Sequence, residues 1–408
     1  SIDMNIQNQL QQAVDNNLAA YTEKSSEGVY SMQGAATCVD NSTGNVVAIV
    51  GSRSQEDIKG YVLNRAYQSY RQPGSCIKPL NVYTPYLQLG NTPDTKVTDS
   101  QIDGGPANAD ASYAGEMTLT DAVKWSKNTV AWNIYQQITP KTGSSFLIKM
   151  GFHKIWVDKD YNAGALGGFT YGVTTEEMAG GYAALANDGV YRKATCIRLI
   201  VDASNKTVVN ETNRDSKVYD KSASRMMTQM LREVVLSGTG TSANVENAVV
   251  AGKTGTTNAS KDVWFCGYSK YYTTTVWAGY DYPKEMSGVN SRVNAIFKDF
   301  MTAVHTNLPV TDFSTVTQQT TQPETTAAVQ EETESLPQET TAIVPETTGI
   351  EQVTPQQVPS TTAQVPTTTP YQRWTTAPAQ PKTTAPMQYG DIDATTRTDP
   401  DATARGEW

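Results

Sequence analysis

The chain has 408 residues, enough for one large or two ordinary domains, and a formal net charge of −9. Residues 314–408 hold 12 acidic and 4 basic side chains, so they account for −8 of that charge and leave the preceding part near neutral, at about −1 by subtraction. The acidic balance therefore describes the C-terminal segment, and no basic surface indicates a nucleic-acid partner.

The sequence also lacks the signals of a membrane span, of a signal peptide and of a metal site. No run of about 18 apolar residues could span a membrane, and the chain does not begin with a signal peptide. Because Ser1 is not an initiator methionine, we expect a piece of a longer protein whose targeting segment lies upstream. The four cysteines are scattered without a Cys-x-x-Cys pair, and only two histidines are present, so no metal or cofactor site is expected; disulfide formation stays undecided.

The first part of the chain predicts a helix followed by an antiparallel hairpin. Apolar residues recur every four positions across residues 6–18, which is helical spacing. Two apolar runs, 35–40 and 45–51, flank the turn residues Asn41–Gly44 and predict the hairpin. After a loop, a helix is predicted to begin at Ser75.

From about residue 118 to 240 the pattern is largely helical. The predicted helices cover 118–137, the segment from the capping box Thr174-x-x-Glu177 to Asn187–Gly189, and 223–236. Strand patterns return at 248–251, 263–268 and 273–280, the last two as a second hairpin, before an amphipathic helix over 293–304. Strands at both ends of the domain predict one sheet covered by the terminal helices, with a helical lobe inserted between them and a cleft between the lobes as the default site.

Composition changes sharply near Phe313. Beyond it Thr, Pro, Gln and Ala dominate, and no helix or strand period continues. We therefore predict a folded domain over residues 1–312 and a disordered, extended tail over 313–408.

The segment 71–80, RQPGSCIKPL, combines a serine and a lysine at helical spacing. Ser75 follows the turn Pro73-Gly74 and would lie at a helix N-terminus, with Lys78 on the same face. On its own, this pair could be only a helix cap and a solvated lysine. However, it is the chain's only Ser-x-x-Lys. In addition, Pro79 lacks the N–H that would bond back toward Ser75, and an interrupted helical hydrogen bond of this kind is typical of functional sites.

Two further short motifs follow, and each has a second match elsewhere. Ser126-Lys127-Asn128 lies in the predicted helix 118–137, while Ser242-Ala243-Asn244 also fits Ser-x-Asn. Lys253-Thr254-Gly255 follows a strand pattern, while Lys141-Thr142-Gly143 leads into a helix. We favour Lys253 because it opens a strand edge where another extended backbone could pair.

In this order the three motifs resemble those of penicillin-binding proteins and serine β-lactamases. Over about residues 1–310 the chain resembles the transpeptidase domain of class A, bifunctional penicillin-binding proteins. The likeness extends to Arg71–Ser75, Gly167–Ala179, Ala186–Gly189 and Asp262–Tyr268. It implies an α/β fold of the α+β type, with an antiparallel five-stranded sheet flanked by helices and an inserted all-helical lobe. Two departures are that no glycosyltransferase domain or membrane anchor lies in this sequence, and that the middle motif is Ser-x-Asn where many β-lactamases have Ser-Asp-Asn.

The resemblance implies a peptidoglycan D,D-transpeptidase. Ser75 would attack a D-Ala-D-Ala stem peptide to give an acyl-enzyme, and an amine acceptor would then take the acyl group. β-Lactams would also acylate Ser75. Lys78 is the expected base; its pKa would have to fall about three units from roughly 10.4, and burial and a second cation, Lys253, act in that direction. Ser126 and Asn128 would complete the hydrogen-bonded relay.

The family likeness also implies how the substrate is held. The oxyanion would lie between the backbone N–H groups of Ser75 and Thr256. The hydroxyls of Thr254 and Thr256, beside Lys253, would bind the terminal carboxylate, and Gly255 would let the substrate backbone approach closely. The expected location is extracytoplasmic, at the cell surface or wall, with membrane contact only through an upstream segment.

Two alternatives stay open from the sequence. In a D,D-carboxypeptidase or β-lactamase, water would take the acyl group. Many related β-lactamases place a glutamate four residues before an asparagine, and no glutamate between the second and third motifs has that partner, which disfavours penicillin hydrolysis. The other alternative is an inactive homologue that binds cell-wall peptides; all five relay side chains are present, which argues against it.

Overall fold

The structure, a computed structural model, describes residues 1–55, 62–210 and 215–315. Within them a five-stranded sheet has the order β2-β1-β11-β10-β9, and every neighbouring pair is antiparallel. Its strands come from both ends of the domain: β1 (Met32–Asp40), β2 (Val46–Val50), β9 (Ala251–Thr256), β10 (Asp262–Tyr268) and β11 (Tyr272–Tyr280). The predicted sheet and both predicted hairpins are confirmed.

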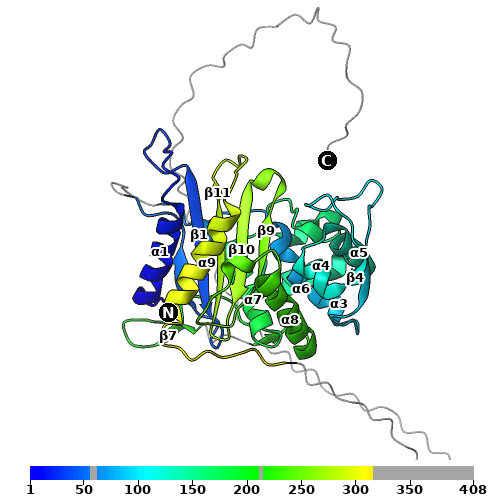
Figure 1. Cartoon of the computed structure of the whole chain (residues 1–408). Helices are drawn as coiled ribbons and strands as arrows, with labels where there is room; N and C mark the ends of the chain where they lie inside the picture. The colour runs from blue at the N-terminus through cyan, green and yellow to red at the C-terminus, as the bar shows by residue number, and fades with distance from the viewer. Residues whose placement is uncertain (56–61, 211–214, 316–408) are drawn as a thin grey trace, which may run out of the picture. The chain divides into compact units, whose positions relative to one another are not determined.

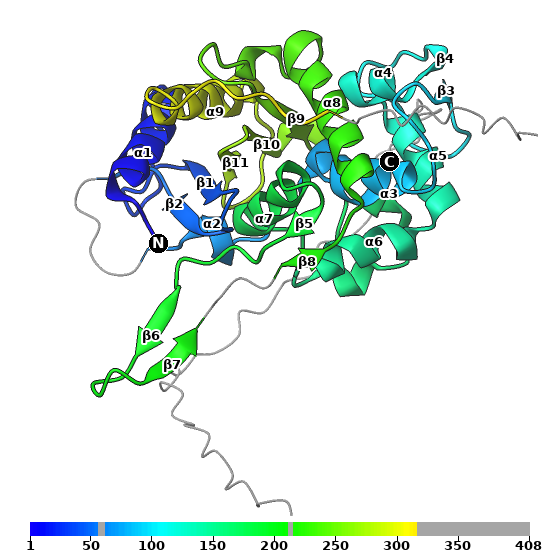
Figure 2. The same ribbon diagram turned by 90° about the horizontal axis from the view of Figure 1, so that it is seen from below.

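Helices cover both faces of this sheet. On one face α1 (Met4–Leu18) and α9 (Asn290–Val304) lie against each other, and on the other lies α7 (Thr175–Ala186) (Figures 1 and 2). The stripe predicted for α1 is buried as expected, since Leu10 and Val14 are fully inaccessible and pack in one cluster with residues of α9. Each such side chain stabilises the fold by roughly 1.5–3 kcal/mol through burial. The capping box of α7 forms as predicted, with bonds between Thr174 and Glu177 in both directions.

Between β2 and β9 the chain builds the second lobe. Its helices are α3 (Thr84–Leu87), α4 (Leu119–Lys124), α5 (Asn128–Ile138) and α6 (Pro140–Lys149). Helix α8 (Lys221–Ser237) contacts both α4 and β9, whereas α2 (Arg65–Gln68) packs against α7 and β1. The lobe is not all-helical, because β3 (Lys96–Asp99) pairs with β4 (Gly115–Thr118) beside α4. Two more ribbons pair β5 (Val190–Tyr191) with β8 (Ser216–Lys217) and β6 (Leu199–Val201) with β7 (Thr207–Asn210); β5 contacts α7, and β6 and β7 project away from the lobe helices (Figure 2). These strands are too short to show a residue period in the sequence.

Two predicted elements have different bounds in the structure. The single helix expected over 118–137 is two helices, because Ser126 has a φ of +58°, which an α-helix cannot contain. The strand expected at 248–251 instead begins at Ala251 and includes the Lys253 motif, since these polar residues pair along β10. Both shifts fall at motifs of the candidate site.

The first residues assigned to the predicted tail, 313–315, contact the folded domain. The ring of Phe313 packs edge-on against Tyr268 with centroids 5.5 Å apart, and Arg225 donates to the Thr315 carbonyl at 2.9 Å. The rest of the predicted tail, 316–408, lies outside the described residues. No helix in the described part combines the length and apolar character needed to cross a bilayer.

Candidate active site

Ser75 lies in a tight turn rather than at the start of an α-helix. Residues Gly74–Ile77 form a 3-10 turn, and a π-helical turn from Pro79 to Tyr83 follows before α3. Because Pro79 has no N–H, the Ser75 carbonyl instead accepts from the Lys78 N–H, as in a 3-10 turn. Side chains three residues apart eclipse in that geometry, so Ser75 and Lys78 lie on one side.

The segment before Ser75 is held by hydrogen bonds from distant elements. The Gln72 side chain donates to the Phe169 carbonyl at 2.7 Å and accepts from the Phe169 N–H at 2.8 Å, while the Trp264 indole donates to the Gln72 carbonyl at 2.8 Å. Gly74 has a φ of +52°, and a Cβ on Gly167 would lie 2.4 Å from its carbonyl oxygen. Glycine is therefore required at both positions for the backbones to approach.

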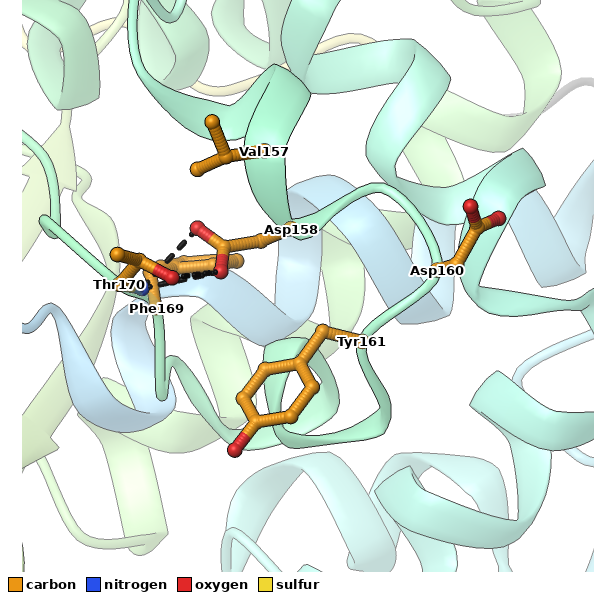
Figure 3. A pocket seen from close by; sticks show the side chains of 6 residues that line it. All are labelled: Val157, Asp158, Asp160, Tyr161, Phe169 and Thr170. Carbon is orange, nitrogen blue, oxygen red and sulfur yellow. Dashed lines mark hydrogen bonds between the residues drawn. The ribbon is translucent and has the colours of Figure 1, made fainter.

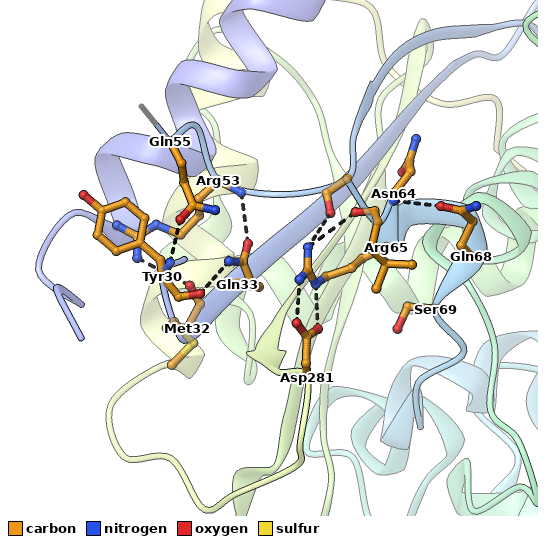
Figure 4. A network of polar contacts seen from close by, with 12 residues as sticks. Tyr30, Met32, Gln33, Arg53, Gln55, Asn64, Arg65, Gln68, Ser69 and Asp281 are labelled. Atoms are coloured by element: carbon orange, nitrogen blue, oxygen red, sulfur yellow. Dashed lines mark hydrogen bonds and ion pairs between the residues drawn. The ribbon is translucent and has the colours of Figure 1, made fainter. Parts of the chain in front are cut away.

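An ion pair fixes the chain further upstream. The Arg65 guanidinium binds the Asp281 carboxylate through two bonds of 2.6 and 2.5 Å, just beyond the end of β11 (Figure 4). Arg71 lies 3.4 Å from the same carboxylate. Burial would raise the pKa of Asp281, but the hydrogen bonds and charge of Arg65, with the charge of Arg71, lower it. Residues 65–71, which lead into the Ser75 turn, are thus fixed to the end of β11 in the central sheet.

Lys78 is fully buried and meets the second motif. Its Nζ donates to the Ser126 carbonyl oxygen at 2.9 Å and to Asn128 Oδ1 at 2.7 Å. Burial, followed by the nearby charge of Lys253, lowers the pKa of Lys78 well below its usual range. A neutral amine has two N–H donors and one lone pair, so these two bonds leave the lone pair free to accept a proton. The Ser75 hydroxyl itself makes no hydrogen bond to any residue that the structure describes.

The second motif spans the break between α4 and α5. Ser126 occupies the left-handed conformation and reaches Lys78 through its carbonyl, while its hydroxyl belongs to a half-buried side chain. Asn128 is the first residue of α5, and its Nδ2 donates to the Ala107 carbonyl at 2.9 Å. That bond orients the amide so that Oδ1 is the atom presented to Lys78.

The third motif lies on β9, the edge strand beside the Ser75 turn. The Cys76 thiol donates to the Lys253 carbonyl at 3.2 Å, and a Cβ on Gly74 would lie 2.7 Å from the Thr256 carbonyl oxygen. A Cβ on Gly255 would lie 2.4 Å from the Pro73 carbonyl oxygen. The lack of a side chain at Gly255 therefore lets the turn before Ser75 pack against β9, whereas the sequence analysis had expected it to make room for the substrate backbone. Lys253 is fully buried, and burial lowers its pKa to about 8.

Two residues that the sequence analysis did not single out contact the third motif. Thr239, in the loop after α8, bonds the Thr254 hydroxyl at 2.8 Å, and Asn290, at the start of α9, accepts from the Thr256 hydroxyl at 3.1 Å. Neither belongs to a motif; the glycines around Thr239 signalled only the end of a helix. The structure thus brings Ser126, Asn128 and the Lys253–Thr256 edge to the Ser75 turn.

The competing motif matches lie in other settings. Lys141–Gly143 is inside α6, as its context predicted. Ser242 lies in a short turn, where its hydroxyl accepts from the Asn294 side chain at 2.8 Å. Neither supplies a residue to the contacts described above.

An open cavity with a volume of about 420 Å³ has Phe169 in its wall (Figure 3). Its lining residues are Val157, Asp158, Asp160, Tyr161, Phe169 and Thr170. The Asp158 carboxylate is occupied by the Thr170 N–H and hydroxyl, at 3.0 and 2.6 Å. None of these lining residues belongs to the three motifs, so no reactive group lines this cavity. Across the described ranges, no three His, Cys, Asp or Glu side chains are placed to hold a metal ion.

Comparison with known sequences gives a consistent family. The family model of the penicillin binding protein transpeptidase domain matches residues 34–302. Penicillin-binding protein 1A of Clostridium perfringens is 32% identical over 333 residues, covering 76% of this chain and 49% of that protein. Penicillin-binding protein 4 of Bacillus subtilis is 34% identical over 265 residues, covering 64% and 42%. The chain therefore spans about half the length of the curated relatives it matches, or less.

Solved structures share the fold. Penicillin-binding protein 1A from Haemophilus influenzae superposes with a TM-score of 0.64 at 20% identity, covering 77% of this chain and 67% of that one. The PonA1 protein from Mycobacterium tuberculosis, in complex with penicillin V, gives 0.63 at 22% identity and covers 77% and 86%. At these identities the likeness is one of fold.

Proposed function

The chain belongs to the penicillin-binding protein transpeptidase family, as a transpeptidase domain of the class A kind, and on that premise we propose that it cross-links peptidoglycan through an acyl-enzyme on Ser75. The observation that carries this proposal is the state of Lys78. It is buried, its pKa is lowered, its amine donates two hydrogen bonds, and it lies one 3-10 turn after Ser75. Such a lysine can act as a base near neutral pH.

The proposed reaction has two steps. Ser75 Oγ attacks the carbonyl carbon between the two D-alanines while its proton passes to Lys78 Nζ. The C–N bond breaks, and the departing D-alanine amine takes that proton, directly or through the Ser126 hydroxyl. An acceptor amine then attacks the ester, gives a proton back through the same relay, and releases Ser75 with a new amide bond. A β-lactam enters at the first step, where its ring amide opens.

Binding of the substrate would use the edge strand. The N–H groups of Ser75 and Thr256 would stabilise the oxyanion, where loss of one donor typically costs about 10²–10³ in rate. The Lys253 ammonium and the hydroxyls of Thr254 and Thr256 would hold the terminal carboxylate. Stem peptides with an amine acceptor, and β-lactams, are the partners that this arrangement fits.

We place this activity outside the cytoplasm, at the cell surface. The C. perfringens and B. subtilis relatives are penicillin-binding proteins, and the PonA1 structure carries penicillin V.

Treatment with benzylpenicillin should give one stable covalent adduct per chain, located on the peptide that contains Ser75. Intact-mass spectrometry followed by peptide mapping measures both the stoichiometry and the site. Persistence of the adduct supports a transpeptidase, because water then resolves the acyl-enzyme poorly. Rapid loss of the adduct with turnover of penicillin would instead identify the hydrolase alternative, and an adduct on another residue would contradict the assignment of the nucleophile.

The rate constant for acylation should follow a bell-shaped pH profile. It rises with pH through the lowered pKa of Lys78, because only the neutral amine can accept the Ser75 proton. It falls above about 8, where Lys253 loses the proton that makes it a binding partner for the carboxylate of penicillin. Stopped-flow labelling with a fluorescent penicillin measures this profile. A rate constant that climbs steadily through pH 8 and beyond would contradict the role of Lys253.

A further inference from the structure

Lys127, the middle residue of the second motif, is a nearly buried lysine with two acidic partners. Its ammonium lies 2.9 Å from the Asp110 carboxylate and 3.3 Å from that of Asp99, and it also donates to the Ser112 carbonyl and hydroxyl, each at 3.1 Å. The Lys127 side chain is 6% exposed and that of Asp99 is not exposed at all. Groups this deeply placed are retained only where their charges are paired.

The carboxylate of Asp99 connects this ion pair to helix α5. It accepts from the Asn108 side chain at 2.6 Å and from the Thr129 hydroxyl at 2.5 Å. The oxygen of the Asn108 amide in turn accepts from the backbone N–H groups of Asn128 and Thr129, at 2.7 and 3.3 Å. Lys127 occupies the N-cap position of α5 but makes no side-chain capping bond, so Asn108 caps the helix from another part of the chain.

The same segment determines which way the Asn128 side chain faces. The Ala107 carbonyl accepts from Asn128 Nδ2 at 2.9 Å, and Oδ1 of that amide accepts from Lys78. The neighbouring Ser126, with a φ of +58°, is in a conformation that persists only where its surroundings impose it. The Asn128 acceptor therefore depends directly on contacts with residues 99–112, and the Ser126 carbonyl is one residue from Lys127, whose ammonium binds the same segment.

We propose that Lys127 is a positioning residue for acyl transfer, whose ammonium clamps residues 99–112 onto the second motif and so holds Ser126 and Asn128 against Lys78. This inference rests on the proposed function. With an apolar side chain at 127, the buried Asp99 would lose its counter-charge, and the segment that caps α5 and orients Asn128 would be free to move away. A misplacement of about 1 Å at a reactive group can cost about 10² in rate.

The test compares three variants by acylation with a fluorescent penicillin. Lys127→Met removes the ammonium at similar length, Lys127→Arg keeps the positive charge, and Lys149→Met, in α6 with an exposed side chain, is the matched control. Stopped-flow measurement at saturating penicillin gives the acylation rate constant for bound penicillin, separately from its dissociation constant.

We expect Lys127→Met to lower that rate constant by about 10² with little change in the dissociation constant, because the carboxylate clamp on β9 is untouched. Lys127→Arg should recover most of the rate, since a guanidinium also pairs with carboxylates. Lys149→Met should behave as the unaltered protein. A merely structural role would lower thermal stability and leave the acylation rate constant of the folded protein unchanged.

The outcomes separate this inference from the proposed function. Wild-type acylation by folded Lys127→Met, or equal losses in the Met and Arg variants, would overturn the positioning role of the charge. If Lys127→Met does not fold, the acylation rate constant of Asp110→Asn tests the proposal instead. A loss of about two- to fivefold, as expected for a partly exposed ion pair, supports the positioning role of Lys127, and an unchanged rate constant overturns it. Labelling of a Ser75→Ala variant in the same assay would instead refute the nucleophile and leave the contacts of Lys127 unexplained.

Discussion

Replacement of Ser75 by alanine should abolish covalent labelling by penicillin while the domain stays folded. The hydroxyl is the only group that the variant loses, and it makes no hydrogen bond to the described residues, so the fold does not depend on it. Without the nucleophile no ester can form, and the adduct should fall from one per chain to none. Gel fluorescence with a fluorescent penicillin and intact-mass spectrometry both measure this loss.

Ser145→Ala provides the matched control for that experiment. Ser145 lies in α6, where its hydroxyl donates to the Thr142 carbonyl at 2.7 Å. This variant should label like the unaltered protein, and thermal unfolding should show that both variants are folded. Undiminished labelling of Ser75→Ala would mean that another residue is the nucleophile.

Replacement of Lys78 by methionine should lower the acylation rate constant by about 10²–10⁴, the usual contribution of a positioned general base. Methionine fills a similar volume and offers no lone pair for the Ser75 proton. Binding of penicillin before acylation should change much less, since Lys253 and the β9 hydroxyls remain. Stopped-flow labelling of Lys78→Met, with the exposed Lys149→Met as control, measures both quantities. An acylation rate close to that of the unaltered protein would exclude Lys78 as the base.

The same variant has a second expected signature, in stability against pH. The pKa of Lys78 is lowered in the folded protein, so above that lowered pKa and below about 10.5 the unfolded chain binds one more proton than the folded one. The free energy of unfolding therefore rises with pH across this window. Lys78→Met should flatten that rise, leaving the part due to Lys253 between about 8 and 10.5. An unchanged slope would mean that Lys78 is charged in the folded protein.

Much of the fold was predictable because it depends on local patterns. The helical spacing of apolar residues in α1, the capping box of α7 and the two hairpins at 35–51 and 263–280 each depend on residues close together in the sequence, and the structure confirms them. The boundaries that were wrong lie at the site. Ser126 looked helical because its neighbours are helical. The strand was expected to end before Lys253, because the polar residues 253–256 pair with β10 without following an apolar pattern.

The sequence by itself determined the family, the antiparallel sheet and the order of the three motifs, because those properties are carried by residue type and spacing. Only the tertiary structure decided what surrounds the reactive groups: the burial that lowers the pKa of Lys78, the contact of β9 with the Ser75 turn, and the contacts that Thr239 and Lys127 make. The physical reason is that burial, charge proximity and hydrogen-bond geometry depend on which distant segments meet, and no spacing along the chain specifies that.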